Sequence, residues 1–302
     1  METIGYERLV SDLKKLGVSR GDLLNIKMSL KSIGQVEGGA ETVLNAILDV
    51  VGKEGTVITD SFVEVHRLPL RRKDRVVVDD NTPSYAGALA NAVLKHPDMV
   101  RSRHPIQKFA GIGKLAKELM LSHTPDSYAY DVLRKMSHMG GKNLKIGKDE
   151  VVVGVGTTHV AIGELGFKQN RPSFGVLYRD EKNNIKLFKI NWSGICSDGL
   201  IKFIPYYRKG NAILSEGFVG NADSKITDME KTLQIELDFL KNDPTFFFCD
   251  NPLCDGCRLT WEFSEKKYGL FLYEAIRRKK IKKIVKVFLG EPAYRLINKI
   301  LG

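Results

Sequence analysis

The chain has 302 residues, 43% of them hydrophobic and 27% charged, which is typical of a globular protein rather than of a disordered one. Its formal net charge of +11 suits an acidic ligand, a phosphate-bearing cofactor or an anionic surface. A leader-like N-terminus, a run of roughly 18 apolar residues and base-reading motifs are all missing, so we expect a cytoplasmic protein that neither spans a membrane nor binds nucleic acid.

The first half of the chain alternates helical and strand patterns. Apolar residues at helical spacing predict a helix that stops at Gly17, and LLNIKM (23–28) then predicts a buried strand. A helix over GGAETVLNAILDVVG and a strand over TVITDSF follow. This alternation predicts an α/β fold with a largely parallel sheet flanked by helices.

The pattern changes near residue 170. Before it, YAGALANAVLKH and GIGKLAKELMLSH are expected to be helices, and VVVGVG (151–156) the next buried strand. After it we expect a hairpin turning at Asn183 and Asn184, and a long amphipathic helix in KITDMEKTLQIELDFLKND. The expected parts are therefore 1–170, an α/β unit, and 171–302, an antiparallel β-rich C-terminal unit, together forming one compact domain.

A glycine-rich turn, SLKSIGQVEGGAET (29–42), joins the first strand to the second helix. Free backbone N–H groups at such a turn can receive an anion or a carbonyl, although most turns of this kind are only connections. The turn is neither a dinucleotide-binding fingerprint nor a phosphate-binding P-loop.

The exact amino-acid sequence of this segment is more informative than its motif pattern. SLKSIGQVEGGAETVLNAILDVVGKEGTVI resembles the signature segment of the aminoglycoside 3-N-acetyltransferase family, and RSRHPIQKFAGIGKLAKEL resembles that family's next block. VVVGVG is similar to the strand before its catalytic helix, and CSDG with the late cysteines resembles relatives from surface-polysaccharide pathways. The resemblance implies transfer of an acetyl group from acetyl-CoA to a small-molecule amine, by direct attack of the amine on the thioester.

The resemblance also implies which residues bind the cosubstrate. The expected pantetheine-binding turn comprises Ser29, Leu30, Lys31, Ile33, Gly34 and Val36. The R-S-x-H-P block places Arg101, Ser102 and His104 near the same molecule. Fixed donors of this kind act most strongly where negative charge develops on a thioester carbonyl. Residues 1–170 would then be the cofactor-binding part and residues 171–302 the acceptor-side part.

The catalytic helix departs from the family's pattern, which is threonine, then histidine three residues on, then glutamate three residues further. Thr158 and Glu164 fit that frame, but Ala161 stands where the histidine is expected. His159 is the nearest candidate for the general base that an amine nucleophile requires. On a regular helix it would lie about 140° from Glu164, so a surface or capping role is the alternative.

Further candidates surround this segment. His104 and His138 are fallback bases, and Thr157 and Thr158 are expected either to stabilise the oxyanion or to cap the helix. A polycationic acceptor needs carboxylates, for which the candidates are Asp60, Glu64 and Asp198. The acceptor is expected to be an aminoglycoside or another amino sugar. Two alternatives remain open: acylation of a nucleotide- or lipid-linked amino sugar, and a non-catalytic CoA-binding protein, which Ala161 favours.

The cysteines cluster late in the chain. Cys249, Cys254 and Cys257 form a C-x4-C-x2-C arrangement, and Cys196 or a histidine is the candidate fourth ligand. Closed structural zinc sites need four such ligands. Structural zinc, an iron–sulfur cluster and plain buried thiols are the three interpretations.

The C-terminal segment combines a basic run, RRKKIKKIVK (277–286), with apolar residues near helical spacing. A basic amphipathic helix over 276–289 favours peripheral contact with an anionic membrane surface. The alternative is a solvated helix that packs on its own domain.

Overall fold

The computed structural model describes residues 3–152, 154–265 and 268–301. Its strands are β1 (Leu23–Met28), β2 (Thr56–Asp60), β3 (His66–Arg67), β4 (Val77–Val78), β5 (Val100–Arg101), β6 (Phe109–Gly113), β7 (Lys142–Ile146), β8 (Phe174–Arg179), β9 (Ile185–Lys189), β10 (Ile213–Val219) and β11 (Ala222–Asp228). Its α-helices are α1 (Tyr6–Leu16), α2 (Leu30–Ile33), α3 (Gly39–Val51), α4 (Ala88–Lys95), α5 (Ala116–Leu121), α6 (Asp131–His138), α7 (Thr157–Glu164), α8 (Ile204–Lys209), α9 (Met229–Asn242), α10 (Asp255–Arg258), α11 (Tyr268–Arg277), α12 (Ile281–Ile284) and α13 (Gly290–Leu301). Two 3-10 helices, η1 (Arg72–Asp74) and η2 (Ser197–Phe203), and a π-helical turn, η3 (Val285–Leu289), complete the set.

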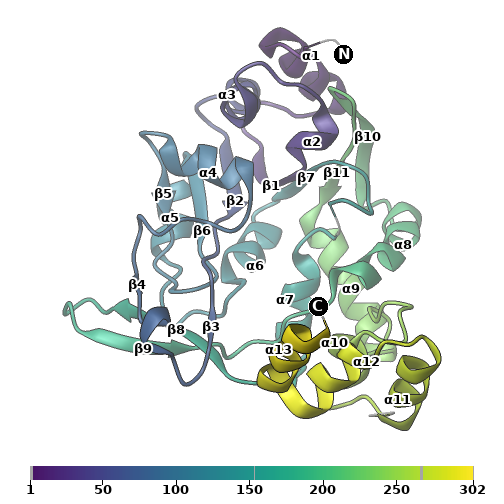
Figure 1. Ribbon diagram of the computed structural model, residues 1–302. Coiled ribbons are helices and arrows are strands. Elements are labelled where there is room, and N and C mark those ends of the chain that lie inside the picture. Colours follow the sequence, from purple (N-terminus) through teal and green to yellow (C-terminus); the bar gives the residue numbers. More distant parts are fainter. Residues whose placement is uncertain (1–2, 153, 266–267, 302) are drawn as a thin grey trace.

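The main sheet has seven strands in the order β10-β11-β7-β1-β2-β6-β5 (Figure 1). β1 pairs in parallel with β2 and with β7, whereas the other neighbouring pairs are antiparallel. The α/β class is thus confirmed, and the expected largely parallel sheet is wrong. The helices α2 and α3 join the parallel strands β1 and β2, while β10 and β11 form a hairpin, a connection that requires antiparallel neighbours.

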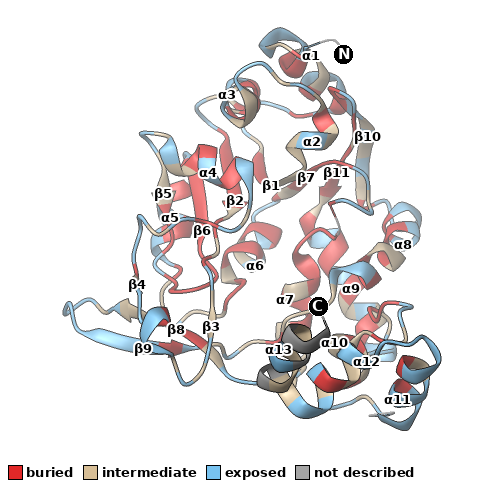
Figure 2. Cartoon of the chain, viewed as in Figure 1, coloured by how far each residue is buried: buried red, intermediate tan, exposed pale blue. Residues whose placement is uncertain are grey.

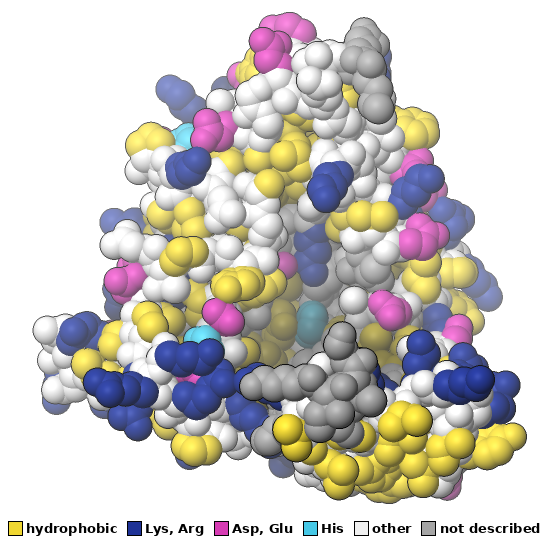
Figure 3. Space-filling model, in the orientation of Figure 1, with side chains coloured by type: hydrophobic (Ala, Val, Ile, Leu, Met, Phe, Trp, Pro, Cys, Tyr) yellow, Lys and Arg dark blue, Asp and Glu magenta, His cyan; other side chains and the backbone are white. Residues whose placement is uncertain are grey.

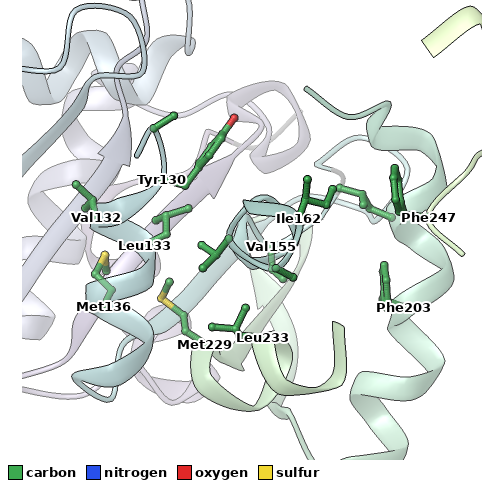
Figure 4. Close-up of a cluster of buried hydrophobic side chains, with 14 of the residues drawn as sticks. Tyr130, Val132, Leu133, Met136, Val155, Ile162, Phe203, Met229, Leu233 and Phe247 are labelled. Atoms are coloured by element: carbon green, nitrogen blue, oxygen red, sulfur yellow. The ribbon is translucent and has the colours of Figure 1, made fainter. Parts of the chain in front are cut away.

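Helices cover both faces of this sheet. On one face, α1, α3 and α4 bury an apolar cluster against the central strands. On the other, α6, α7 and α9 pack side by side, with α7 in contact with both of its neighbours (Figures 1 and 2). Figure 4 shows side chains of these three helices in one buried cluster with Phe203 and Phe247, which come from the second half of the chain. α7 is therefore held in the middle of the larger core.

A smaller sheet extends from the main body. β8 pairs with β3, β4 and β9, and the β8–β9 hairpin turns through Asn183, whose φ of 64° is left-handed. The predicted hairpin and the antiparallel character of the C-terminal part are confirmed here. β10 and β11 belong to the same part of the sequence but complete the main sheet, so that sheet draws strands from both sides of residue 170.

One predicted strand is wrong, and one predicted helix begins later than expected. The described residues of VVVGVG, 151–152 and 154–156, form a loop, and the buried strand is β7, which precedes them. Gly154 and Gly156 have φ values of 72° and 88°, which no strand accommodates. GIG (111–113) completes β6, and the predicted helix begins only at Ala116.

The C-terminal helices pack on the segment that carries the late cysteines. Phe271, Ala275 and Val285 are buried, the first two against Leu253 and Leu259. The predicted basic helix is interrupted after α11, where Lys279 has a φ of 53°. Exposed apolar residues of this segment include Ile276, Ile281, Phe288 and Leu289. Figure 3 shows an apolar patch at the bottom of the molecule, where Figure 1 places the C-terminal helices. Among the described residues no helix is long and apolar enough to cross a membrane, and membrane-surface contact stays a prediction.

Candidate active site

The carboxyl ends of β1 and β2 meet the N-terminus of α7. Lys27 on β1 places its Nζ 3.7 Å from Oδ2 of Asp60, the last residue of β2. A Cβ on Gly156, the residue that precedes α7, would lie 3.8 Å from the same Nζ. Figure 3 shows this face hollowed at its centre, over α6 and α7, with a histidine side chain in the hollow. The ends of two central strands and the N-terminus of α7 thus bring Lys27 and Asp60 close together.

His159 lies in the first turn of α7, which begins at Thr157. Its ring stacks on the ring of Tyr130 at 4.2 Å between centroids and 10° between planes. Burial, together with the nearby charge of Lys27, lowers the pKa of His159 to about 3. The imidazole is therefore neutral near pH 7, and its buried Nδ1 has no hydrogen-bond partner among the described residues.

The structure does not bring Glu164 to His159. Glu164 is the last residue of α7, its side chain is exposed, and no hydrogen bond joins it to the imidazole. Ala161 is fully buried in the apolar cluster between the helices. A histidine at position 161 would consequently face the core, whereas one at position 159 reaches Tyr130 and the neighbourhood of Lys27.

Thr157 and Thr158 turn their hydroxyls away from the start of α7. Thr158 Oγ1 donates to Oε1 of Glu236, and Thr157 Oγ1 lies 3.1 Å from Oγ1 of Thr232, both on α9. Neither caps the helix, which has Gly156 at its N-cap and no side-chain cap. The backbone N–H groups of this turn, rather than the threonine hydroxyls, are thus the donors that point outward from the helix.

Glu236 is the site residue that sequence reasoning missed. It is fully buried, it accepts hydrogen bonds from Thr158 and Tyr207, and burial raises its pKa to about 7. The signal was in the sequence, because Glu236 continues the apolar face of α9 formed by Met229, Leu233 and Leu240. A carboxylate on such a face requires buried partners.

The glycine-rich turn lies beside the loop that leads to α7. Ser29 is the N-cap of α2, its Oγ accepts from the Ser32 backbone N–H, and its own N–H donates to the Ile146 carbonyl at the end of β7. Ile33 is fully buried and Gly34 lies against Asn221, whereas Leu30 and Val36 are half-buried and Lys31 is exposed. The turn is therefore close to the candidate site, and its role in holding pantetheine stays a prediction.

Arg101, Ser102 and His104 of the R-S-x-H-P block are buried, and their placement near the cosubstrate stays a prediction. The Arg101 guanidinium donates to the carbonyls of Ser61, Asp80 and Thr82 at 2.6–2.8 Å. The hydroxyl of Ser102 accepts from the Phe109 N–H at 2.9 Å. The polar groups of Arg101 and Ser102 form hydrogen bonds within the protein, so these side chains order the neighbouring loops.

His104 forms a buried stack with His123, with ring centroids 4.8 Å apart. Its Nδ1 accepts from the N–H groups of Ile106 and Gln107. Burial lowers the pKa of His104 to about 3 and that of His123 to about 4. Both rings are therefore neutral near pH 7.

We expect the free energy of unfolding to fall when the pH is lowered from 7 to 5. Both histidines have a lowered pKa in the folded state, so their contribution is present above the unfolded value near 6.5 and is lost toward pH 4. Each ring then contributes a loss of about 2 kcal/mol at pH 5. His159, with a pKa of about 3, adds a similar loss, whereas Glu236, whose folded pKa of about 7 lies above its unfolded value, offsets about 2 kcal/mol, so the expected net loss is about 4 kcal/mol. Urea unfolding at both pH values measures the loss, and His104→Asn, which keeps an acceptor near the Nδ1 position, should remove about half of it. The control is His138→Asn, at an exposed position, and an unchanged pH dependence in His104→Asn would contradict the prediction.

The remaining candidates are scattered. Asp60 lies beside Lys27 at the end of β2 and accepts from Nε2 of Gln107 at 3.3 Å. Glu64 accepts from the hydroxyl of Tyr85, and Asp198 is exposed in the first turn of η2. His138 is exposed at the end of α6, before the N-terminal end of β7. The four cysteines, in contrast, come together.

Residues 26–241 match the sequence model of a family described as aminoglycoside 3-N-acetyltransferase. The chain is 32% identical over 158 residues to aminoglycoside N(3)-acetyltransferase VII of Streptomyces paromomycinus, covering 46% of this chain and 54% of that protein. It is 38% identical over 126 residues to aminoglycoside N(3)-acetyltransferase III of a Salmonella species, covering 37% and 43%. The matched regions span about half the length of these curated relatives. A solved structure described as AAC-IIIb binary with CoASH shares the fold, with a TM-score of 0.68, 19% identity, and 80% and 97% of the two chains covered.

Proposed function

Because the chain belongs to the aminoglycoside 3-N-acetyltransferase family, we propose that it transfers the acetyl group of acetyl-CoA to an amine of an aminoglycoside or another amino sugar. The family match includes the glycine-rich turn and the whole of α7, so it covers both the expected donor site and the candidate base. The observation that carries the proposal is the position of His159 in the first turn of α7, where its ring stacks on Tyr130 and its Nδ1 has no hydrogen-bond partner among the described residues.

The proposed chemistry assigns one task to each of these groups. Neutral His159 accepts a proton from the amine as the amine nitrogen attacks the thioester carbonyl carbon. Negative charge then develops on the carbonyl oxygen, where the Lys27 ammonium and the uncapped N–H groups of α7 stabilise it. Collapse of the tetrahedral intermediate breaks the carbon–sulfur bond, and the thiolate of CoA leaves and takes up a proton.

The acceptor is proposed to enter on the acidic side of the hollow. Asp60 is held by Lys27 and Gln107, so its carboxylate is fixed in direction before a ligand arrives. An amino group of the acceptor, bound beside Asp60, would be close to the His159 imidazole. Glu64 and Asp198 remain candidates for additional ammonium groups of a larger acceptor.

A second acceptor class is favoured by the C-terminal helices. Exposed Ile276, Ile281 and Leu289 lie within or next to the basic run 277–286. Apolar and basic groups in this combination bind anionic lipid surfaces. A lipid-linked amino sugar in glycan synthesis would be presented at such a surface, and a nucleotide-linked amino sugar would suit the basic charge.

We expect release of free CoA thiol from acetyl-CoA when the chain is mixed with an amine from the right class. The panel comprises an aminoglycoside, a nucleotide-linked amino sugar and a lipid-linked amino sugar in anionic vesicles, and calorimetric titration measures acetyl-CoA binding separately. Turnover on one class identifies the acceptor. Tight acetyl-CoA binding without thiol release on any amine would overturn the proposal in favour of a non-catalytic CoA-binding protein.

A further inference from the structure

Four cysteines from two distant segments converge beside the core. Cys196 precedes η2, Cys249 follows α9, and Cys254 and Cys257 begin and occupy the short helix α10. Their four Sγ atoms all lie within 4.8 Å of one another, and all four are free thiols. They are the only cysteines of the chain, so its whole complement is gathered at one point.

The spacing of the sulfurs fits a single tetrahedral metal ion. Zinc–thiolate bonds of about 2.3 Å in tetrahedral geometry separate the sulfurs by about 3.8 Å. The Sγ atoms of Cys249 and Cys257 are 3.8 Å apart. A disulfide requires about 2.05 Å. In a cluster of several irons, the cysteines bind different metal atoms around the cluster rather than one centre.

We infer that Cys196, Cys249, Cys254 and Cys257 bind one Zn²⁺ as four thiolates. Binding releases four thiol protons and leaves the centre with a net charge of −2. All four coordination positions are then filled by protein, so the ion has no open position for substrate and its role is structural.

The surroundings of the cysteines suit a doubly negative centre. A backbone N–H points at a sulfur, since the amide of Cys249 lies 3.5 Å from Sγ of Cys257. The Arg258 guanidinium donates to the Cys249 carbonyl at 2.6 Å. A Cβ on Gly256 would lie 3.6 Å from the Arg171 guanidinium and 3.9 Å from Sγ of Cys254, so a second cation borders the same loop. Two arginines therefore offset the charge of a tetrathiolate.

The proposed ion would fasten three parts of the second half together. Gly199 in η2 packs so closely on the other cysteine segment that a Cβ there would lie 2.0 Å from the Phe247 carbonyl oxygen. Phe247 is buried in the same cluster as α7 (Figure 4). Asp255, between two of the cysteines, pairs with Lys283 of α12 at 2.6 Å. The centre thus joins η2, the end of the α9 segment and the C-terminal helices.

Metal analysis of the purified full-length chain tests the inference. Protein from zinc-supplemented cells, never exposed to a chelator, is expected to contain one zinc per chain, and Cys254→Ser and Cys196→Ser to lose most of it. Asp250→Asn, beside Cys249 but with all four thiols, is the matched control and should keep its zinc. Wild-type protein without zinc, iron in place of zinc, or zinc retained by the double variant Cys196→Ser/Cys254→Ser would overturn the assignment.

A second measurement covers the case in which a cysteine variant fails to fold. Exchange of the wild-type metal for Co²⁺ should give the intense visible absorption of tetrahedral cobalt with sulfur-to-metal charge transfer, and the four thiols should be protected from a thiol reagent until the metal is removed. Weak octahedral cobalt bands, or four thiols that react at once, would overturn the inference. Neither readout uses acetyl transfer, so this result and the test of the proposed function are independent.

Discussion

Replacing His159 with asparagine is expected to lower kcat for acetyl transfer by about 10²- to 10⁴-fold, the usual contribution of a general base. Acetyl-CoA affinity should be retained, because the glycine-rich turn and Lys27 are unchanged. Thiol release at saturating acetyl-CoA measures kcat, and calorimetric titration measures affinity. His138→Asn is the matched histidine control and should keep wild-type kcat. His138 is exposed at the end of α6, before the N-terminal end of β7.

Glu164→Gln separates two explanations of the same loss. If Tyr130 alone orients the imidazole through the 4.2 Å stack, removal of the Glu164 charge leaves kcat nearly unchanged. If His159 and Glu164 come together during turnover, Glu164→Gln should lower kcat as His159→Asn does. A wild-type kcat in His159→Asn would show that this histidine is not the base, whatever Glu164 does.

Local elements were predictable where the chain signals its own boundaries. α1 is followed by Gly17 in the left-handed conformation, and β1 corresponds to LLNIKM. Strand direction was not predictable in the same way, because it depends on which strand a segment pairs with after folding. β6 lies antiparallel to β2 although a helical stretch separates them, and 151–156 has strand-like residues but two left-handed glycines.

The site was also predictable only in part, because some of its contacts form between segments that are distant in the sequence. The resemblance pointed to the segment that forms α7, and His159 was recognisable as a residue of the right type. The partner of Thr158 was not, because Glu236 is 78 residues away and becomes its neighbour only when α9 packs on α7. The cysteine spacing suggested three ligands and left Cys196 or a histidine as the fourth, and only the folded structure shows that Cys196 lies with the other three.

Replacing Glu236 with alanine is expected to lower the free energy of unfolding by about 3–5 kcal/mol, because it removes one partner from a buried polar network. The hydroxyls of Thr158 and Tyr207 would lose their acceptor inside the core, and a cavity would open between α7 and α9. Urea unfolding at pH 7 measures the change. Glu230→Ala, at an exposed position on the same helix, is the control and should change stability little.

Glu236→Gln tests the protonation state of the same carboxyl. The folded pKa of about 7 lies above the unfolded value near 4.5, so the contribution of Glu236 to stability is present below pH 4.5 and is lost as the pH rises through 7. Glutamine keeps an acceptor for Thr158 and Tyr207 and does not ionise. Relative to wild type, Glu236→Gln should therefore gain about 2 kcal/mol between pH 5 and pH 7. If the two proteins kept a constant difference, Glu236 would be ionised in the fold, and its two hydroxyl donors would outweigh the cost of burying its charge.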